Sequence, residues 1–207
     1  EYPDVPMDRG KILWEEDFDK FVEEHGKWGR YNDVDGDGIP YRTGAGNRRE
    51  GSAYFARGTG HDAFARYSED PDVWKAGMDR LHVKFKTAEQ YVPDAIVDKV
   101  EGTKVGIISY GSLDSAIAEA RDMLAAKGLK TSYLRLRALP ITDTVRNFIA
   151  EHDEIFVVEM NHDGQLREIL SVDMPGHGAK LVSSTLNNGL SLTAQWICDD
   201  ILAKKEN

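Results

Sequence analysis

Three aspartates alternate along the stretch DVDGDG: Asp33, Asp35 and Asp37. This spacing can present several carboxylate oxygens to one side of a loop, and such oxygens are the ligands that calcium prefers. An EF-hand is excluded, because the bidentate carboxylate it needs at the twelfth position of the loop is replaced by Gly44. Two interpretations remain: a single cation held by the three aspartates with help from elsewhere, or a turn, which is the more common use of alternating Asp and Gly.

A second group of polar side chains follows in the stretch EMNHDGQ, where Glu159, Asn161, His162 and Asp163 lie close together in sequence. They could form an acid/base pair or a contact across a subunit boundary. Alternatively, Asn161 and Asp163 make a turn and cap the next helix. The second interpretation is favoured because no nucleophile lies nearby, and Cys198 is expected to be a small buried apolar residue.

Composition excludes several classes of function. The chain has 36 acidic and 26 basic residues, a net charge of -10, which argues against a nucleic-acid surface. One cysteine cannot build a disulfide framework, a cysteine-ligated zinc site or an iron-sulfur cluster, and such usage fits a reducing cytoplasm. No apolar run approaches the roughly 20 residues that span a bilayer, so no membrane is expected.

The elements that must position these residues change character near residue 100. Residues 25–74 are rich in Gly, Arg, Asp and aromatic side chains and show no convincing long helix or strand. So many aromatic residues are not typical of disorder, so we predict an ordered arm that lies on another surface. The spacing of apolar residues then predicts a helix over 72–92, stopped by Pro93. Residues 1–11 resemble a linker and begin without Met, as expected of the later part of a longer chain.

From residue 101 onward, short apolar runs alternate with helical segments. Strands are predicted at 104–110, 131–139, 154–160 and 179–185, and helices at 111–128, 143–152, 165–174 and 191–205, with Thr142 and Gly128 at helix ends. This alternation predicts an α/β fold with a mostly parallel sheet covered by helices on both faces. The expected domains are therefore an arm with a linker helix at 1–100 and an α/β domain at 101–207.

Parallel sheets bind ligands at the carboxyl ends of their strands, which makes the loops YGSLD, RALPIT and EMNHDGQ the candidates for that role. None has the glycine pattern of a dinucleotide or phosphate loop, which opposes a nucleotide-binding protein. A weak anion site at Gly111 and Ser112 remains an alternative.

Several motifs together resemble the C-terminal half of the alpha subunit of 2-oxoacid:ferredoxin oxidoreductases, and are most similar to the 2-oxoglutarate type, 2-oxoglutarate synthase. The motifs are DVDGDGIPYRT, RGTGHD, YSEDP, YGS, TSYLRLRALP and VVEMNHDGQLREIL, which follow one another along essentially the whole chain. The resemblance implies an enzyme that decarboxylates a 2-oxoacid with thiamine diphosphate, makes an acyl-CoA and CO2, and passes electrons through iron-sulfur clusters to ferredoxin.

The same resemblance implies how the work is divided. Residues 101–207 would be the transketolase C-terminal-like domain, and residues 1–100 the arm that leaves the pyrimidine-binding domain upstream. The beta subunit would hold the diphosphate, Mg2+ and a cluster, so this segment would support assembly and be inactive alone. The whole complex would be cytoplasmic, with coenzyme A and the 2-oxoacid as ligands.

In such an assembly the loop DGDGIPYRTG would lie near the catalytic region. Arg42 and His61 are the candidates for contact with an anionic group of substrate or coenzyme A, because a guanidinium can grip a carboxylate or phosphate with two hydrogen bonds. Pairing with acidic neighbours is the alternative for both. No catalytic residue of the family is transferred to this chain. The competing function is an independent α/β interaction module whose loop at Asp33, Asp35 and Asp37 binds Ca2+.

Overall fold

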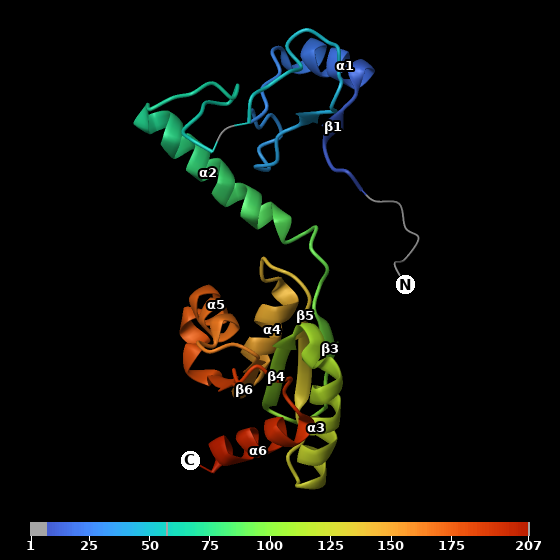
Figure 1. The fold of residues 1–207 in the computed structure, drawn as a ribbon, viewed down its shortest axis with the longest axis vertical. Coiled ribbons are helices and arrows are strands. Elements are labelled where there is room, and N and C mark those ends of the chain that lie inside the picture. Colours follow the sequence, from blue (N-terminus) through green and yellow to red (C-terminus); the bar gives the residue numbers. More distant parts are fainter. Residues whose placement is uncertain (1–7, 57, 207) are drawn as a thin grey trace. The chain divides into compact units, whose positions relative to one another are not determined.

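The computed structural model describes residues 8–56 and 58–206, which form two compact units that meet between Ala88 and Glu89 (Figure 1). Most of the predicted linker, residues 1–7, lies outside the described residues. Residues 89–100, which the sequence assigned to the arm, belong to the second unit. In the described ranges, no helix has the length and apolar character needed to cross a bilayer.

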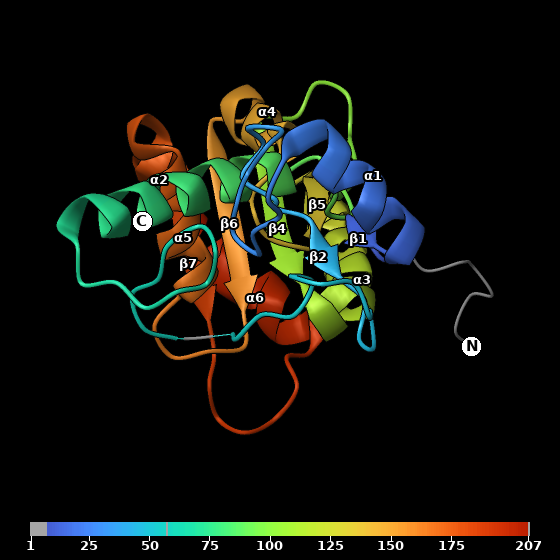
Figure 2. The same cartoon turned by 90° about the horizontal axis from the view of Figure 1, so that it is seen from above.

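The second unit is built on a five-stranded sheet with the order β3-β5-β4-β6-β7. The strands are β3 (Ile96–Asp98), β4 (Val105–Tyr110), β5 (Ser132–Leu136), β6 (Glu154–Glu159) and β7 (Leu181–Thr185). All neighbouring pairs are parallel except β3 with β5. β6, β4 and β5 are seen side by side in Figure 2. The predicted α/β fold with a mostly parallel sheet is therefore confirmed.

Two pairs of helices cover the two faces of this sheet. The helical segments are η1 (Gly111–Leu113), α3 (Asp114–Ala126), α4 (Asp143–Glu151), α5 (Gln165–Asp173), η2 (Pro175–Lys180) and α6 (Ala194–Lys205). Ile107 packs with α3 and α6, whereas Ile108 packs with α4 and α5, because successive side chains of a strand point to opposite faces. Burial on both faces explains why the central strands read as continuous apolar runs.

Polar contacts tie the chain that enters the second unit to α4. The hydroxyl of Thr142 donates to Asp94 Oδ1 at 2.6 Å, and that of Thr144 donates to Asp94 Oδ2 at 2.5 Å. These bonds hold the pKa of Asp94 below its ordinary value. Thr142 does occupy the N-cap position of α4, but its side chain makes no cap hydrogen bond. The position of the predicted cap is correct, but its hydrogen bond is not, because the Thr142 hydroxyl donates to the Asp94 carboxylate and does not bond to the first amides of α4.

Arg146 on α4 adds a second tie. Its guanidinium pairs with Glu89 at 3.0 Å, with Asp173 at 2.9 Å and with Asp143 at 3.1 Å. Glu89, Asp173 and Arg146 are all about one quarter exposed at their side chains. The start of the unit, α4 and α5 are therefore joined by one partly buried charge network.

The first unit has little regular structure but has a core of its own. Its elements are β1 (Ile12–Leu13), α1 (Glu15–His25), β2 (Arg42–Thr43) and α2 (Pro71–Ala88), and β1 pairs with β2 in parallel. Leu13, Phe18, Phe21 and Trp28 are buried together. α1 was not predicted, because only two of its residues are buried between charged neighbours.

The aromatic residues of this unit divide into two groups. Trp28 is buried, and its indole nitrogen donates to the Tyr41 carbonyl at 3.3 Å. Phe55 and Trp74 are in contrast exposed by 68% and 56%. Helix α2 ends at Ala88, earlier than predicted, and none of its described residues is buried. The unit is therefore ordered, and its proposed packing on another surface stays a prediction.

Gly106 in β4 offers a test of the packing between the sheet and α4. A Cβ atom at this position would lie 2.8 Å from Phe148 Cε1 and 3.4 Å from His152 Cγ. We expect Gly106→Ala to lower the free energy of unfolding by about 1–3 kcal/mol, the usual cost of overpacking. Gly176→Ala is the matched control in the same unit, because a Cβ there meets no atom within 4 Å. Urea unfolding of both variants measures the difference, and equal stabilities would contradict the packing described.

Candidate ligand-binding pocket

The three aspartates of the acidic stretch have different partners. Asp33 accepts hydrogen bonds from the Gly36 and Gly38 amides, at 3.1 and 2.8 Å. Asp35 and Asp37 each lie 2.6 Å from the ammonium group of Lys11. In the part of the chain that the structure describes, no three His, Cys, Asp or Glu side chains are grouped to hold a metal ion. Asp33 therefore forms an Asx turn, and the carboxylates of Asp35 and Asp37 both pair with Lys11.

This turn lies directly on helix α2. Gly38 has a left-handed backbone with φ of 79°, and a Cβ there would lie 2.3 Å from the Lys84 amide nitrogen. Arg80 Nη1 donates to the Gly38 carbonyl at 2.9 Å, and the Thr87 hydroxyl donates to the Asp37 carbonyl at 2.6 Å. The absence of a side chain at Gly38 therefore lets the turn reach the helix backbone and orient Arg80.

Next to this contact, the first unit contains a pocket of about 320 Å³. Its walls include Tyr31, His61, Phe64, Arg66, Val73 and Arg80. The rings of Tyr31 and His61 stack with their centroids 3.9 Å apart and 22° between their planes. His61 Nδ1 lies 3.1 Å from the Asp62 carbonyl. A neighbouring hollow of about 170 Å³ shares His61 and Arg80, so these two residues border both spaces.

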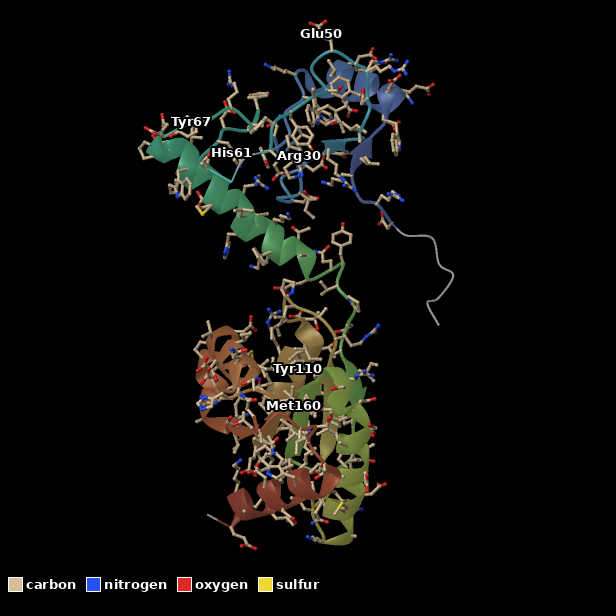
Figure 3. All side chains as sticks on the ribbon, viewed as in Figure 1. Arg30, Glu50, His61, Tyr67, Tyr110 and Met160 are labelled. Carbon is tan, nitrogen blue, oxygen red and sulfur yellow. The ribbon has the colours of Figure 1, made fainter. Side chains whose placement is uncertain are left out.

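Arg66 and Arg80 line this pocket, and Arg30 lies close to the ring of Tyr31, another lining residue. The three arginines differ in their partners. Arg66 is paired with Asp62, with 2.7 Å between Nη2 and the carboxylate. Arg30 and Arg80 instead have their guanidinium carbons 5.2 and 5.8 Å from the Tyr31 ring centroid. Burial lowers the pKa of Arg80, and the charge of Arg30 acts in the same direction. Figure 3 labels Arg30 and His61, which come from separate loops of the unit.

The two residues predicted to contact an anion are not brought together. His61 lines the pocket, whereas Arg42 lies on β2 and donates to the Arg9 carbonyl at 2.7 Å. Sequence reasoning missed Arg30, Tyr31 and Arg80. Arg80 lies in a helix that the sequence predicted. The loops that bring Tyr31 and His61 to it come from distant parts of the sequence, so no local spacing of residues reveals that these side chains lie together.

The second unit has a different pocket, of about 410 Å³, at the carboxyl ends of its strands. Gly111, one half of the expected anion site, lines it together with Tyr110, Leu139, Ile169 and the basic residue Arg137. Tyr110 and Met160, which follow neighbouring strands, are labelled near one another in Figure 3. The lining is mainly apolar, which suits an anion poorly.

The polar loop after β6 makes a helix cap. Glu159 is fully buried and accepts from the amides of Leu166 and Arg167 at 2.7 and 3.0 Å, at the start of α5. Asn161 donates to the same carboxylate at 2.7 Å and accepts from the Gly164 amide at 2.6 Å. The predicted turn and cap is confirmed for Asn161, and Glu159 adds to it. It is wrong for Asp163, whose carboxylate instead lies 2.7 Å from His162 Nδ1. Cys198 is fully buried, as predicted.

Gly38 provides a test of how the acidic turn is held. Gly36→Ala adds a side chain to a left-handed residue with open space around it, so we expect a loss of about 1–2 kcal/mol in the free energy of unfolding. Gly38→Ala has the same backbone strain and also a clash with α2, which should cost about 1–3 kcal/mol more. Urea unfolding followed by tryptophan fluorescence compares the two variants. A Gly38→Ala protein as stable as Gly36→Ala would contradict the contact.

The Lys11 pair predicts a pH effect. The hydrogen bond from Lys11, with a smaller contribution from Tyr41, holds the pKa of Asp35 below its ordinary value. A depressed pKa stabilises the fold above the unfolded value of about 3.9, and this stability is lost as pH falls through the folded value. We expect Lys11→Met to raise the Asp35 pKa, measured by carboxyl NMR titration. An Asp35 pKa that is unchanged in Lys11→Met would rule out this pairing.

Comparison with known proteins gives two informative matches and one negative result. No model of a known protein family matches the chain. Over 172 residues, 80% of the chain, it is 31% identical to 2-oxoacid:ferredoxin oxidoreductase 2, subunit alpha, of Aeropyrum pernix. The chain spans 25% of the length of that curated relative.

A solved structure shows the same fold. The 2-oxoglutarate:ferredoxin oxidoreductase from Magnetococcus marinus, with 2-oxoglutarate, coenzyme A and succinyl-CoA bound, matches with a TM-score of 0.70 at 24% identity. The match covers 87% of this chain and 31% of that one. The sequence similarity to the Aeropyrum pernix protein identifies the chain as homologous to part of the alpha subunit of a 2-oxoacid:ferredoxin oxidoreductase.

Proposed function

We propose that this chain is a supporting part of the alpha subunit in a thiamine-diphosphate-dependent 2-oxoacid:ferredoxin oxidoreductase. The observation that carries the proposal is the 31% identity to the Aeropyrum pernix alpha subunit, which extends over 80% of the chain. The reaction would convert a 2-oxoacid and coenzyme A to an acyl-CoA and CO2, with transfer of electrons to ferredoxin. The second unit would be the transketolase C-terminal-like domain that supports assembly.

We further propose 2-oxoglutarate as the 2-oxoacid. The motifs of the chain resemble the 2-oxoglutarate type, and the Magnetococcus marinus enzyme with the same fold contains 2-oxoglutarate and coenzyme A. At 24% identity that similarity supports the fold alone, so the choice of substrate depends on experiment.

The cofactors of such an enzyme would be held by other polypeptide, because the side chains present here do not fit them. An iron-sulfur cluster needs several thiolates, whereas the chain has one cysteine, which is buried in the second unit. Asp35 and Asp37 already share an ion pair with Lys11, which also weakens the calcium-module alternative. We therefore assign thiamine diphosphate, Mg2+ and the cluster to the upstream part of the alpha subunit and to a beta subunit.

The exposed surface of the first unit is consistent with this supporting role. Trp74, Met78 and Phe85 on α2 are 56%, 45% and 66% exposed. Apolar residues gathered on one helix mark surfaces that other polypeptide covers. In the proposed assembly, α2 and the aromatic loops would contact the catalytic subunits, and the pocket at His61 and Arg80 would face the substrate or coenzyme A.

The proposal predicts activity only in the assembled enzyme. We would isolate the complex that contains this chain by an affinity tag and measure coenzyme A-dependent reduction of ferredoxin with 2-oxoglutarate, pyruvate and 2-oxobutyrate. We expect turnover with 2-oxoglutarate to exceed that with pyruvate by at least about tenfold, because binding the second carboxylate adds charge-assisted hydrogen bonds. The chain alone should neither bind thiamine diphosphate nor turn over.

Two results would count against the proposal. Thiamine diphosphate binding by the isolated chain would contradict the supporting role. A tagged complex without 2-oxoacid-dependent ferredoxin reduction would contradict the reaction, whereas a preference for another 2-oxoacid would correct the substrate only.

A further inference from the structure

Large apolar side chains of the second unit are exposed around its pocket of about 410 Å³. Tyr110, Leu139 and Ile169 line this pocket and are 41%, 50% and 42% exposed. Leu136 and Leu166 also line it, but they are almost fully buried and form its floor. Because the walls are still half exposed, a molecule bound between them would remove apolar surface from water, which favours binding.

The pocket lies where open α/β sheets bind their ligands. Tyr110 is the last residue of β4, Leu136 is the last residue of β5, and Gln165 begins α5, the helix that follows β6. In the order β5-β4-β6, the chain passes from β4 to β5 on one side and then crosses to β6 on the other. Such a reversal opens a crevice at the carboxyl ends of the strands. The topology therefore points to this pocket independently of its lining.

Two polar side chains at the pocket have few partners of their own. Among the described residues, the Gln165 carboxamide has no hydrogen-bond partner, and the Arg137 guanidinium has one long bond of 3.5 Å to the Asp94 carbonyl. The Asp94 carboxylate is near enough to feel the charge of Arg137. Its oxygens, however, already accept from the Thr142 and Thr144 hydroxyls. A guanidinium and an amide are thus left to bind a polar group at an apolar hollow.

We propose that this pocket binds a small monocarboxylate with an apolar body, which packs against Tyr110 and Ile169 while its carboxylate pairs with Arg137. The pocket volume lies within the range of sites for small organic molecules, which combine an apolar lining with a few polar groups. A guanidinium can hold a carboxylate with two parallel hydrogen bonds. One cation beside a mainly apolar lining suits such a molecule better than a small, fully polar anion. The pocket belongs wholly to the second unit, so its ligand does not depend on the reaction proposed above.

Methyl NMR titration of the 207-residue chain tests the site with defined probes. Hydrocinnamate carries a phenyl ring and a carboxylate, hydrocinnamyl alcohol has a hydroxyl in place of the carboxylate, and propionate lacks the ring. We expect hydrocinnamate to shift the methyl resonances of Leu139 and Ile169 saturably. It should bind at least about fivefold more tightly than the alcohol, because the charge-assisted hydrogen bonds are lost. Propionate should cause no saturable shift, because it buries little apolar surface.

Two pairs of variants assign the binding to this pocket, and all four positions are exposed, so the fold should persist. Arg137→Gln should weaken hydrocinnamate binding at least about fivefold and leave binding of the alcohol nearly unchanged. Its control is Lys127→Gln, which removes a positive charge that pairs with Asp199 outside the pocket. Ile169→Gln should weaken binding of both probes at least about threefold, because apolar contact is lost. Its control is Val172→Gln on the same helix, outside the pocket, which should change neither.

Several results would overturn the inference. They are equal affinities for hydrocinnamate and its alcohol, a loss in Lys127→Gln equal to that in Arg137→Gln, and a loss in Val172→Gln equal to that in Ile169→Gln. Absence of saturable shifts at Leu139 and Ile169 would overturn it as well.

Two other occupants of the pocket are also distinguished. If sedimentation shows dimers of the chain that Ile169→Gln abolishes, a second copy covers the pocket. If equilibrium dialysis shows hydrocinnamate binding to the chain but not to the tagged complex, another polypeptide covers it. Either result would overturn the small-molecule site, whereas a monomeric chain and a complex that both bind hydrocinnamate would support it.

Discussion

The contact between the acidic turn and helix α2 determines the arrangement of the first unit. A residue with a side chain at position 38 would meet the helix backbone at 2.3 Å, so the approach requires glycine. The contact directs Arg80 toward the turn and thereby places one guanidinium beside the Tyr31 and His61 rings. In the same turn, Asp35 and Asp37 both pair with Lys11. The aspartates that resemble a cation site in the sequence therefore hold the acidic turn in place next to the pocket at Tyr31 and His61.

The second unit depends on a different constraint, the burial of its central strands on both faces. Ile107 and Phe156 pack against α3 and α6, while Ile108 and Val157 pack against α4 and α5. Polar groups in this unit are largely used internally: Glu159 caps α5, and Arg146 joins α4 to α5 through Asp173. A buried carboxylate that accepts backbone hydrogen bonds is a structural element, because its charge is already compensated.

The two units offer different kinds of surface. The first unit offers cationic and aromatic side chains and an exposed apolar helix, and the second offers a stable scaffold with an apolar hollow at one edge of the sheet. Neither unit gathers, among the described residues, the cysteines or carboxylates that clusters and metal ions need. The proposed role as a supporting segment of an alpha subunit would use these features without requiring chemistry that the side chains lack.

The amino-acid sequence by itself determined the α/β fold of the second unit, because buried parallel strands and amphipathic helices leave strong local patterns. It also placed most strands and helices near their observed positions and predicted that Cys198 is buried. It did not reveal α1, and Thr142 could not be assigned correctly, since the preference of its hydroxyl for Asp94 depends on a residue 48 positions away. Only the tertiary structure brought Arg30, His61 and Arg80 around Tyr31 and left Arg42 elsewhere. Such groupings depend on how loops cross a helix, and loop paths are set by long-range packing that no short stretch of sequence encodes.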